Sequence, residues 1–315
     1  MSQQPQLSII IVSWNVRALL RRALTSCRAS WGNHPGLEMI VVDNVSTDGT
    51  VEMLREEFPQ VTVVVNEENR GFTGGNNDGI DRARGSYLLL LNPDTEVLED
   101  ALPRMVAYLD QHRDVGMVGP QLRNPDGSVQ SSRRRFPTLP VLFLESTWLQ
   151  GLLPRRTLEH YYVEDRSPET AHAVDWITGA AMLTRRAVVN EVGGMDETFF
   201  MYSEELDWCR RIHAAGWEIH YVPDAQVVHY EGKSSEQVVP ARHIYFQSSK
   251  VHYARKYHGP WLAEILRLWL LGQYVWQMGV EGAKWLIGHR RPLRAERLAA
   301  YRRVLRSRLR QQEPL

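Results

Sequence analysis

The sequence predicts an α/β protein built on a doubly wound, mostly parallel β-sheet, followed by a helical C-terminal extension. Four apolar runs rich in β-branched residues or leucine recur in the first hundred residues, and segments with helical spacing separate them. Such strand–helix alternation is typical of parallel sheets covered on both faces. From about residue 241 the chain becomes helical in pattern, aromatic and rich in arginine.

The four runs that we expect to be parallel strands show little alternation between apolar and polar residues, which is typical of strands buried on both faces. They are LSIIIVSW (7–14), LEMIVVDN (37–44), VTVVVNE (61–67) and SYLLLLN (86–92). Helices are predicted between them and over residues 99–112, and a Gly- and Asn-rich loop at 69–85 is expected to lead into a helix.

The second half of the expected sheet domain has a weaker pattern. We predict a strand and a Pro-Asp-Gly turn at 115–130, an irregular segment with short helices at 131–170, a strand and short helix at 173–194, an acidic loop opening a helix at 199–217, and a strand pair broken by proline at 218–230. The predicted domains are therefore residues 1–240 and residues 241–315.

Composition limits the classes of function. The 315 residues carry 37 Lys+Arg and 37 Asp+Glu, so no net charge favours binding to nucleic acid. Two cysteines are too few for a disulfide framework and suit a reducing compartment. The N-terminal apolar run has no preceding basic residues, so it is expected to be a strand rather than a signal peptide. No apolar stretch is long enough for a membrane span.

Polar residues follow the predicted parallel strands at 13–15, 43–44, 66–70 and 92–94. In doubly wound sheets these carboxyl ends share one edge, where ligands bind. A single Asp in such a place is ordinary turn chemistry, but several polar ends on one edge predict a site. The segment GFTGGNN (71–77) lacks a P-loop lysine, and GxGxxG is absent. It is either a tight loop with positive φ at Gly74 or Gly75, or backbone that approaches a nucleotide closely.

Seven segments occur in a specific order: SIIIVSWN, VVDNVSTDGT, ENRGFTGGNNDGI, LLLLNPDTEV, WITGAAMLTRRAV, GGMDETFFMYSEELDWCRRIHAAGW and VVHYEGKS. Each is permissive alone, but the ordered set resembles the family-2 inverting glycosyltransferases of the GT-A fold, and in particular their rhamnosyltransferase-like branch. The resemblance covers roughly residues 7–250.

The resemblance implies a nucleotide site at the first strand ends. Asp43 matches the position that accepts a hydrogen bond from the imide N–H of uracil or thymine, a donor that cytosine N3 lacks. Ser13, Trp14 and Asn15 would line the same pocket, although Trp14 can equally be a core residue. The other predicted donor-binding residues are Arg70, Gly75, Asn76, Asn92 and Asp94.

The NPD segment occupies the place of the family's DxD motif, with Asn92 where the first Asp stands. The resemblance therefore implies Asp94 as the main protein ligand of Mg²⁺ or Mn²⁺, with diphosphate oxygens completing the shell. His229 matches a late histidine that reaches the metal in some members. A lone histidine at a strand end is also commonly structural.

The SEELDW segment (203–208) matches the family's acidic motif at a helix start. An inverting transfer needs a base for the acceptor hydroxyl, and Glu205 aligns with it, although neighbouring Glu204 remains an alternative. The acids can also simply stabilise the helix N-terminus. Asp207 is expected to pair with Arg210 or Arg211.

The segment WITGAAMLTRR (176–186) resembles the part of the family that lies beneath the sugars. Trp176 or Asp175 would contact the acceptor or donor sugar, and Gly179 would let the sugar approach the backbone. Small residues packed inside a strand are the alternative interpretation.

The C-terminal extension combines tryptophan and leucine with many arginines; residues 290–310 hold nine Arg and one Glu. Such helices can lie in an anionic membrane interface, or they can form a homodimer or core contact with a solvated basic face. We predict a cytoplasmic enzyme, peripheral on the inner face of the membrane. It would transfer a hexose, with L-rhamnose from dTDP-rhamnose the leading donor, to a saccharide or lipid-linked saccharide. A nucleotidyltransferase and a non-catalytic membrane-bound scaffold are the alternatives.

Overall fold

The computed structural model describes residues 4–230 and 239–310. Within these residues the chain forms two compact units. The first holds residues 4–136, 158–197 and 204–230, and contains the β-sheet. The second holds Pro137–Thr157, Thr198–Ser203 and residues 239–310, and is helical. The helical unit thus includes two segments from before residue 240 as well as the C-terminal part of the chain.

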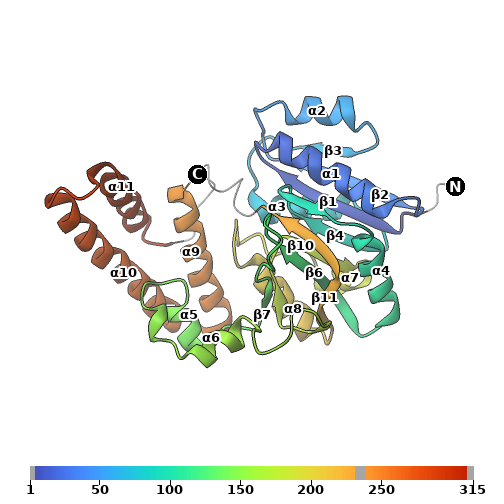
Figure 1. Cartoon of the computed structure of the whole chain (residues 1–315). Coiled ribbons are helices and arrows are strands. Elements are labelled where there is room, and N and C mark those ends of the chain that lie inside the picture. The colour runs from blue at the N-terminus through green and yellow to red at the C-terminus, as the bar shows by residue number, and fades with distance from the viewer. Residues whose placement is uncertain (1–3, 231–238, 311–315) are drawn as a thin grey trace. The chain divides into compact units, whose positions relative to one another are not determined.

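The main sheet has the strand order β3-β2-β1-β4-β10-β6-β11-β5, with β8 paired to β11 (Figure 1). Its strands are β1 Leu7–Ser13, β2 Leu37–Asp43, β3 Thr62–Val65, β4 Tyr87–Leu91, β5 Thr95–Val97, β6 Val115–Arg123, β8 His172–Ala173, β10 Ala181–Arg185 and β11 Glu218–His229. The four predicted parallel strands β1 to β4 are confirmed. Strand β10 is antiparallel to both β4 and β6, so β6 and β11 again run parallel to β4.

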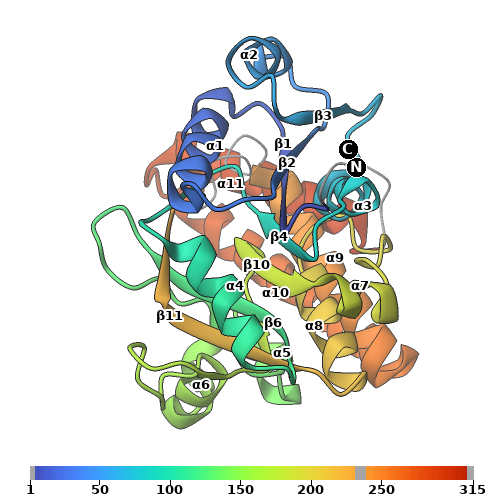
Figure 2. The same cartoon turned by 90° about the vertical axis from the view of Figure 1, so that its right-hand side faces the viewer.

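Helices cover both faces of this sheet. They are α1 Arg17–Trp31, α2 Thr50–Glu57, α3 Gly71–Arg82, α4 Ala101–Gln111, α7 Arg186–Val192 and α8 Glu204–Ala214. Figure 2 shows α1 and α4 on one side of the sheet and α3, α7 and α8 on the other. Successive side chains of β1 point to opposite faces of the sheet, so the strand packs against helices on both sides. Ile9 and Ile11 join the core cluster with α1 and α4, whereas Ile10 and Val12 face α3.

The expected loop at the Gly-rich segment is wrong, because α3 begins at Gly71 and includes GFTGG. The positive φ lies at Gly71 (69°), not at Gly74 or Gly75. These glycines serve close packing instead. A β-carbon on Gly75 would lie 2.8 Å from a methyl carbon of Val12, and one on Gly79 would lie 2.3 Å from a methyl carbon of Ile10. Helix α3 can therefore approach β1 only where side chains are missing.

The expected strand pair at 218–230 is also wrong, because β11 is one twelve-residue strand. Its pairing with β6 shifts register between Val222 and Gln226, where Pro223 cannot donate a ladder hydrogen bond. The segment 131–170 does contain short elements: β7 Arg133–Arg134, which pairs with β9 Trp176–Ile177, α5 Leu139–Leu144, the 3₁₀ turn η1 Gln150–Leu152 and α6 Arg155–Tyr161.

The helical unit is built on α9 Val239–His258, α10 Pro260–Leu286 and α11 Arg291–Ser307. Leu266, Leu270 and Tyr274 of α10 are buried, together with Tyr253 of α9 and Val304 of α11. Helices α10 and α11 are also joined by a buried ion pair, with Arg294 Nη1 2.6 Å from Glu281 Oε2. Across residues 4–230 and 239–310, no helix combines the length and hydrophobicity needed to cross a membrane.

Candidate active site

The candidate site lies along one edge of the main sheet, where the parallel strands end. Ser13 and Asp43 are level in the β1–β2 register, and their carbonyl groups accept the N–H groups of Asn44 (2.9 Å) and Asn66 (3.0 Å). Because β10 is antiparallel, its first residue lies opposite the last residue of β4, Leu91. The carboxyl end of β11, at His229, falls on the same edge. The fold thus brings the polar strand ends together.

Asp43 is 1% exposed, and its two carboxylate oxygens have different surroundings. Oδ2 accepts the backbone N–H of Ser46 at 2.9 Å, whereas Oδ1 is buried and has no hydrogen-bond partner among the described residues. The hydroxyl of Ser13, at the neighbouring strand end, is likewise buried and without a partner there. Leaving a buried polar group unpaired costs about 1–3 kcal/mol. This pair of groups therefore fits a ligand that supplies an N–H donor.

Trp14 and Asn15 follow β1 at this edge. Trp14 is only partly buried and does not belong to the core cluster. Asn15 joins two loops: its N–H donates to Ser46 Oγ (2.9 Å), and its Oδ1 accepts the N–H of Thr47 (2.7 Å). Asn15 and Val45 both have positive φ, 52° and 63°. Such conformations are costly, above all for a β-branched residue, and they commonly mark functional sites.

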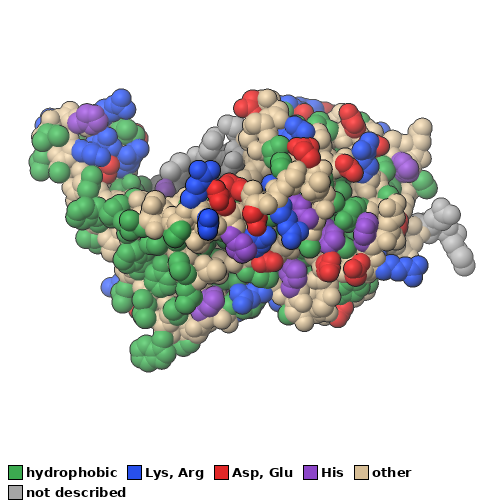
Figure 3. Space-filling view, turned by 60° about the horizontal axis from the view of Figure 1, so that its bottom comes forward, with side chains coloured by type: hydrophobic (Ala, Val, Ile, Leu, Met, Phe, Trp, Pro, Cys, Tyr) green, Lys and Arg blue, Asp and Glu red, His purple; other side chains and the backbone are tan. Residues whose placement is uncertain are grey.

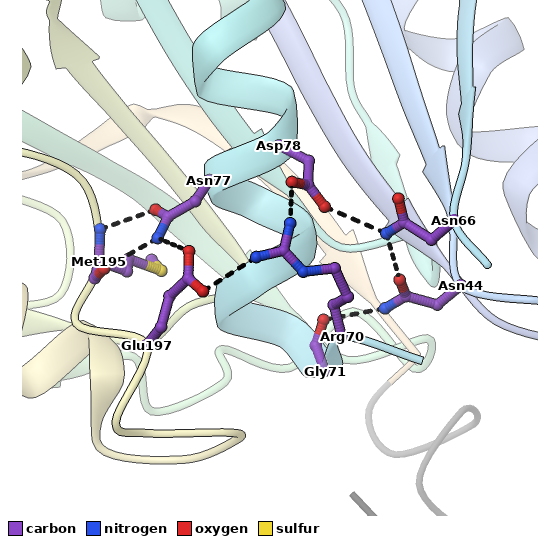
Figure 4. Close-up of polar contacts among 8 residues, drawn as sticks. All are labelled: Asn44, Asn66, Arg70, Gly71, Asn77, Asp78, Met195 and Glu197. Carbon is purple, nitrogen blue, oxygen red and sulfur yellow. Dashed lines mark hydrogen bonds and ion pairs between the residues drawn. The ribbon is translucent and has the colours of Figure 1, made fainter. Parts of the chain in front are cut away.

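The predicted donor-binding residue Arg70 belongs to a network of polar side chains (Figure 4). Its guanidinium pairs with Asp78 and with Glu197, the latter at 2.9 Å. Asp78 in turn accepts from the side chain of Asn66 (3.1 Å), which also donates to Asn44 (2.9 Å). The network ties the ends of β2 and β3 to α3 and to the loop after α7. Arg70 therefore has a structural role in addition to any contact with a donor.

Two further predicted donor-binding residues, Gly75 and Asn76, lie inside α3. Gly75 packs on Val12, as described above, and Asn76 is almost fully buried, with its Nδ2 donating to the carbonyl of Phe72 (2.8 Å). Gly75 lets α3 approach the sheet, and Asn76 makes a hydrogen bond within the first turns of the helix. A role in donor binding stays a prediction for each of them.

Asp94 and His229 are adjacent where β5 pairs with β11. Asp94 is 4% exposed, and its Oδ1 lies 3.4 Å from His229 Nε2. The other ring nitrogen of His229, Nδ1, is 2.8 Å from Gln130 Oε1, which can only accept. In the tautomer that donates from Nδ1 to Gln130, the lone pair of Nε2 is directed to the side of Asp94. Such outer partners orient metal-binding histidines.

These two residues fit a divalent cation whose remaining ligands come from a diphosphate. One carboxylate and one imidazole, with oxygen donors from substrate, suit Mn²⁺ or Mg²⁺. Asn92, at the end of β4, keeps a buried Oδ1 without a hydrogen-bond partner among the described residues. In the same residues, no group of three or more His, Cys, Asp or Glu side chains is placed to hold a metal alone. A resident all-protein metal site is therefore not seen in the part of the chain that the structure describes.

Glu204 and Glu205 open α8 after two residues with positive φ, Tyr202 (72°) and Ser203 (65°). Burial raises the pKa of both carboxyl groups, and the charge of Glu205 raises the pKa of Glu204 further. Opposing this, N–H groups including that of Gly179 lower the pKa of Glu205. The two carboxyl groups therefore titrate as a coupled pair with raised pKa values, in which the N–H groups favour negative charge on Glu205. Each has an Oε2 without a hydrogen-bond partner among the described residues.

The segment before β10 contacts both Glu205 and the end of β4. Gly179 donates its N–H to Glu205, and the next residue, Ala180, accepts the N–H of Asn92 at 2.9 Å. A β-carbon on Gly179 would lie 3.5 Å from the ring of Phe72 and 4.0 Å from Glu205 Cβ. Trp176 is buried, and its indole N–H donates to the carbonyl of Arg135 at 3.0 Å. Gly179 thus borders the candidate site, whereas the contacts of Trp176 are with β7 and the residue after it.

Four residues near the site were not predicted from the sequence: Gln130, Ser46, Glu197 and Arg134. Gln130 orients His229, Ser46 holds Asp43 and Asn15, and the positive charge of Arg134 lowers the pKa of Glu205. Apart from Ser46, which follows Asp43 by three residues, each acts across a long separation in sequence, so no local pattern marks it. The expected partner of Asp207 is confirmed, since Arg211 Nε lies 2.9 Å from its Oδ2.

Comparison with known proteins agrees with this geometry. The model of the glycosyl transferase family 2 matches residues 8–193, more than half of the chain. The chain belongs to glycosyl transferase family 2. It is therefore a glycosyltransferase, and the sheet edge described above lies in the matched part of the chain, apart from α8 and the end of β11.

Similar curated proteins include rhamnosyltransferases. An N-acetylglucosaminyl-diphospho-decaprenol L-rhamnosyltransferase of Mycobacterium tuberculosis is 28% identical over 272 residues, which cover 82% of this chain and 87% of that protein. The rhamnosyltransferase WbbL of Escherichia coli is 30% identical over 149 residues, covering 47% and 53%. The similarity to the mycobacterial protein thus extends past the family model into the C-terminal part of the chain.

Solved structures confirm the expected GT-A-like fold. The mannosyltransferase PcManGT of Pyrobaculum calidifontis, solved with GDP-Man and Mn²⁺, superposes with a TM-score of 0.56 at 17% identity, covering 99% of this chain and 89% of that one. A GalNAc transferase solved with UDP, GalNAc and Mn²⁺ has a TM-score of 0.57 at 16% identity, covering 81% and 48%. At these identities the likeness concerns the fold.

Proposed function

We propose that this glycosyltransferase transfers L-rhamnose, with inversion, from dTDP-L-rhamnose to a lipid-linked saccharide at the inner face of the cytoplasmic membrane. The observation that carries the donor class is the unpartnered Oδ1 of Asp43, held in place by Ser46. Uracil and thymine present an imide N–H to such an acceptor. The sugar and the acceptor class are supported by the names of the similar rhamnosyltransferases.

In the proposed reaction, different residues bind the base, accept the proton and hold the metal. Asp43 and Ser13 bind the base, and Glu205 accepts the proton of the acceptor hydroxyl. The acceptor oxygen then bonds to the anomeric carbon as the bond from that carbon to the diphosphate oxygen breaks, and the nucleoside diphosphate leaves with the electron pair. Asp94 and His229 would hold Mg²⁺ or Mn²⁺, which when bound offsets the negative charge of the leaving diphosphate.

The Asp43→Asn variant tests the donor class. The Ser46 N–H must still be accepted by the amide oxygen, so the amide NH₂ of the variant turns toward the base. It then opposes the imide N–H of thymine but matches N3 of cytosine. We expect affinity for dTDP to fall by about 10–100-fold, as for a lost charge-assisted hydrogen bond, and affinity for CDP to rise.

Calorimetric titration of dTDP, UDP and CDP into wild type, Asp43→Asn and the surface control Glu52→Gln gives these affinities. A donor screen that scores released nucleoside diphosphate with Mg²⁺ or Mn²⁺ completes the test. Wild-type enzyme that uses only guanine or cytosine donors would contradict the proposal. Release of pyrophosphate would indicate a nucleotidyltransferase instead.

The membrane location rests on exposed apolar residues of α10 beside the arginines of α11. Trp261 is 84% exposed and Ile265 is 58% exposed. Burying such side chains in a lipid interface is worth about 1.5–3 kcal/mol each. We expect the double variant Trp261→Ser, Ile265→Ser to bind anionic vesicles about tenfold or more weakly in flotation assays. Val65→Ser, which changes an exposed apolar residue of β3, is the control. Equal flotation of all three proteins would argue against membrane binding by α10.

A further inference from the structure

The residues of α10 that are exposed overall are all uncharged, although the side chains of Glu264 and Lys284 are each 44% exposed on either side of them. The exposed residues are Pro260, Trp261, Ile265, Leu268, Gly272, Val275, Trp276, Gly279, Ala283, Trp285 and Leu286. Most follow one another at intervals of three or four, so those between Trp261 and Ala283 form one face of the helix, here called the uncharged stripe. The left part of Figure 3 shows hydrophobic side chains gathered on this unit.

The charged residues of α10 are occupied on its other faces. Glu264 pairs with Arg267 at 2.5 Å, and Glu281 pairs with Arg294 of α11 at 2.6 Å. Soluble proteins rarely expose an apolar surface that runs for several helical turns unless it binds something. The separation of charge from the stripe therefore indicates a surface made for an apolar environment.

A groove interrupts the stripe where the segment after α5 passes over α10. It has a volume of about 410 Å³ and is lined by Trp148, Leu149, Leu268, Trp269, Gly272, Gln273 and Trp276. The rings of Trp148 and Trp276 stack with centroids 6.0 Å apart, and Gly272 contributes no side chain. All these residues belong to the helical unit.

The chemistry of the groove limits what it can bind. The indole N–H of Trp269 already donates to the carbonyl of Phe143 at 3.0 Å, and the polar lining residue Gln273 is itself 8% exposed. No lining side chain is charged. The Oε1 atom of Gln273 is the polar atom of the lining that is buried without a hydrogen-bond partner among the described residues. Indole and leucine surfaces make up most of the remaining lining, so a hydrocarbon chain gains by burial against them. The volume is in the range of small-molecule sites, about 300–1,000 Å³.

We propose that this groove binds the isoprenoid chain of the lipid-linked acceptor, an inference that rests on the proposed function. The groove opens within the uncharged stripe, so a chain can pass into it from a bilayer in contact with the stripe. The adjacent helix supplies charge complementarity. Residues 290–310 hold nine Arg and one Glu, which suits an anionic lipid and its diphosphate. A second copy of this chain is a less suitable occupant of the groove, because its binding would bring two arginine-rich helices together.

Two glycines of α10 give a matched pair of variants. Outside the helix's own backbone, no atom lies within 4 Å of a β-carbon built on Gly272 or on Gly279. Both are exposed on the stripe, but only Gly272 lines the groove. Leucine at either position adds the same hydrophobicity and the same helix propensity. Only Gly272→Leu places a side chain in the groove.

The two variants are compared on acceptors that share one saccharide diphosphate and differ in lipid, a short geranyl chain or a long polyprenyl chain. For Gly272→Leu we expect kcat/KM to fall about tenfold or more on the long-chain acceptor, the equivalent of about two lost methylene burials, and to be unchanged on the short one. Gly279→Leu is expected to match wild type on both. Equal behaviour of the two variants on the long-chain acceptor overturns the proposal.

Binding is measured separately, so that a failure of the proposed function can be recognised. A polyprenyl phosphate bearing a terminal photoreactive group is cross-linked to wild type and to both variants in neutral phosphatidylcholine vesicles. We expect labelling of residues 148–149 or 268–276 in wild type and in Gly279→Leu, and its loss in Gly272→Leu. This result supports binding in the groove even if no rhamnose is transferred. Labelling spread along the helix, or a dimer in sedimentation that Gly272→Leu dissociates, overturns it.

Discussion

Replacing Glu205 by glutamine is expected to lower kcat about 10³-fold, within the 10²–10⁴ range for loss of a general base, with little change in donor affinity. Glutamine keeps the shape of the side chain and an oxygen that can accept the Gly179 N–H. It cannot take a proton from the acceptor hydroxyl. Single-turnover rates and calorimetric binding of dTDP separate the two effects.

The neighbouring residue supplies the matched control, because Glu204→Gln removes a carboxyl group one position away. If Glu204 stays protonated while Glu205 is ionised, glutamine at 204 changes no charge during turnover. We therefore expect kcat of Glu204→Gln to stay close to wild type, with the acid limb of its pH profile unmoved. In both proteins that limb lies above the ordinary glutamate pKa of about 4.3, since burial raises the pKa of Glu205. A large loss in Glu204→Gln alone would assign the base to Glu204.

At Glu204 we expect the stability of the fold to depend on pH even though kcat of Glu204→Gln stays close to wild type. Burial and the charge of Glu205 raise its pKa, so the folded state holds the proton more tightly than the unfolded chain does. The protein consequently loses stability as pH rises from the unfolded pKa, about 4.3, through the raised folded pKa. Glu204→Gln removes this loss, and its melting temperature relative to wild type should increase with pH across that window.

Strands of the sheet could be predicted from the sequence where burial on both faces makes them a continuous apolar run. Strands β1, β2 and β4 are continuous apolar runs, and their polar ends lie along one edge of the sheet as predicted. The antiparallel insertion of β10 between β4 and β6 could not be predicted, since an apolar run does not specify its neighbours. Likewise, the glycines of α3 have poor helix propensity, and only the close contact with Ile10 and Val12 explains them.

The candidate site shows the same division between local and distant information. Asp43, Asp94 and Glu205 stand in recognisable motifs, and the resemblance to a known family placed them. Gln130 is 99 residues from His229 in sequence, and Glu197 is 127 residues from Arg70, so their contacts follow only from the fold. The residues that hold a functional group in place are therefore the part that sequence reasoning missed.

Removing the carboxylate of Asp94 is expected to abolish metal-dependent turnover while the fold survives. Asp94 is buried beside His229, and its backbone carbonyl, which accepts the N–H of Tyr230 at 2.9 Å, is retained in Asp94→Asn. A neutral amide is a weak ligand for Mg²⁺ or Mn²⁺ compared with a carboxylate. Losing this interaction with the leaving diphosphate is expected to cost about 10²–10³-fold in kcat.

Three measurements on Asp94→Asn separate a metal role from a structural one. Electron paramagnetic resonance of Mn²⁺ in the presence of dTDP should show weaker binding than in wild type or in Asp100→Asn, which changes an exposed aspartate paired with Arg104. A chelator should lower wild-type turnover toward the level of Asp94→Asn and leave that variant's residual rate unchanged, because the metal-dependent part is already lost. Circular dichroism should show the native fold. Wild-type Mn²⁺ affinity in Asp94→Asn would remove this residue from the metal site and leave His229 without a carboxylate partner for the cation.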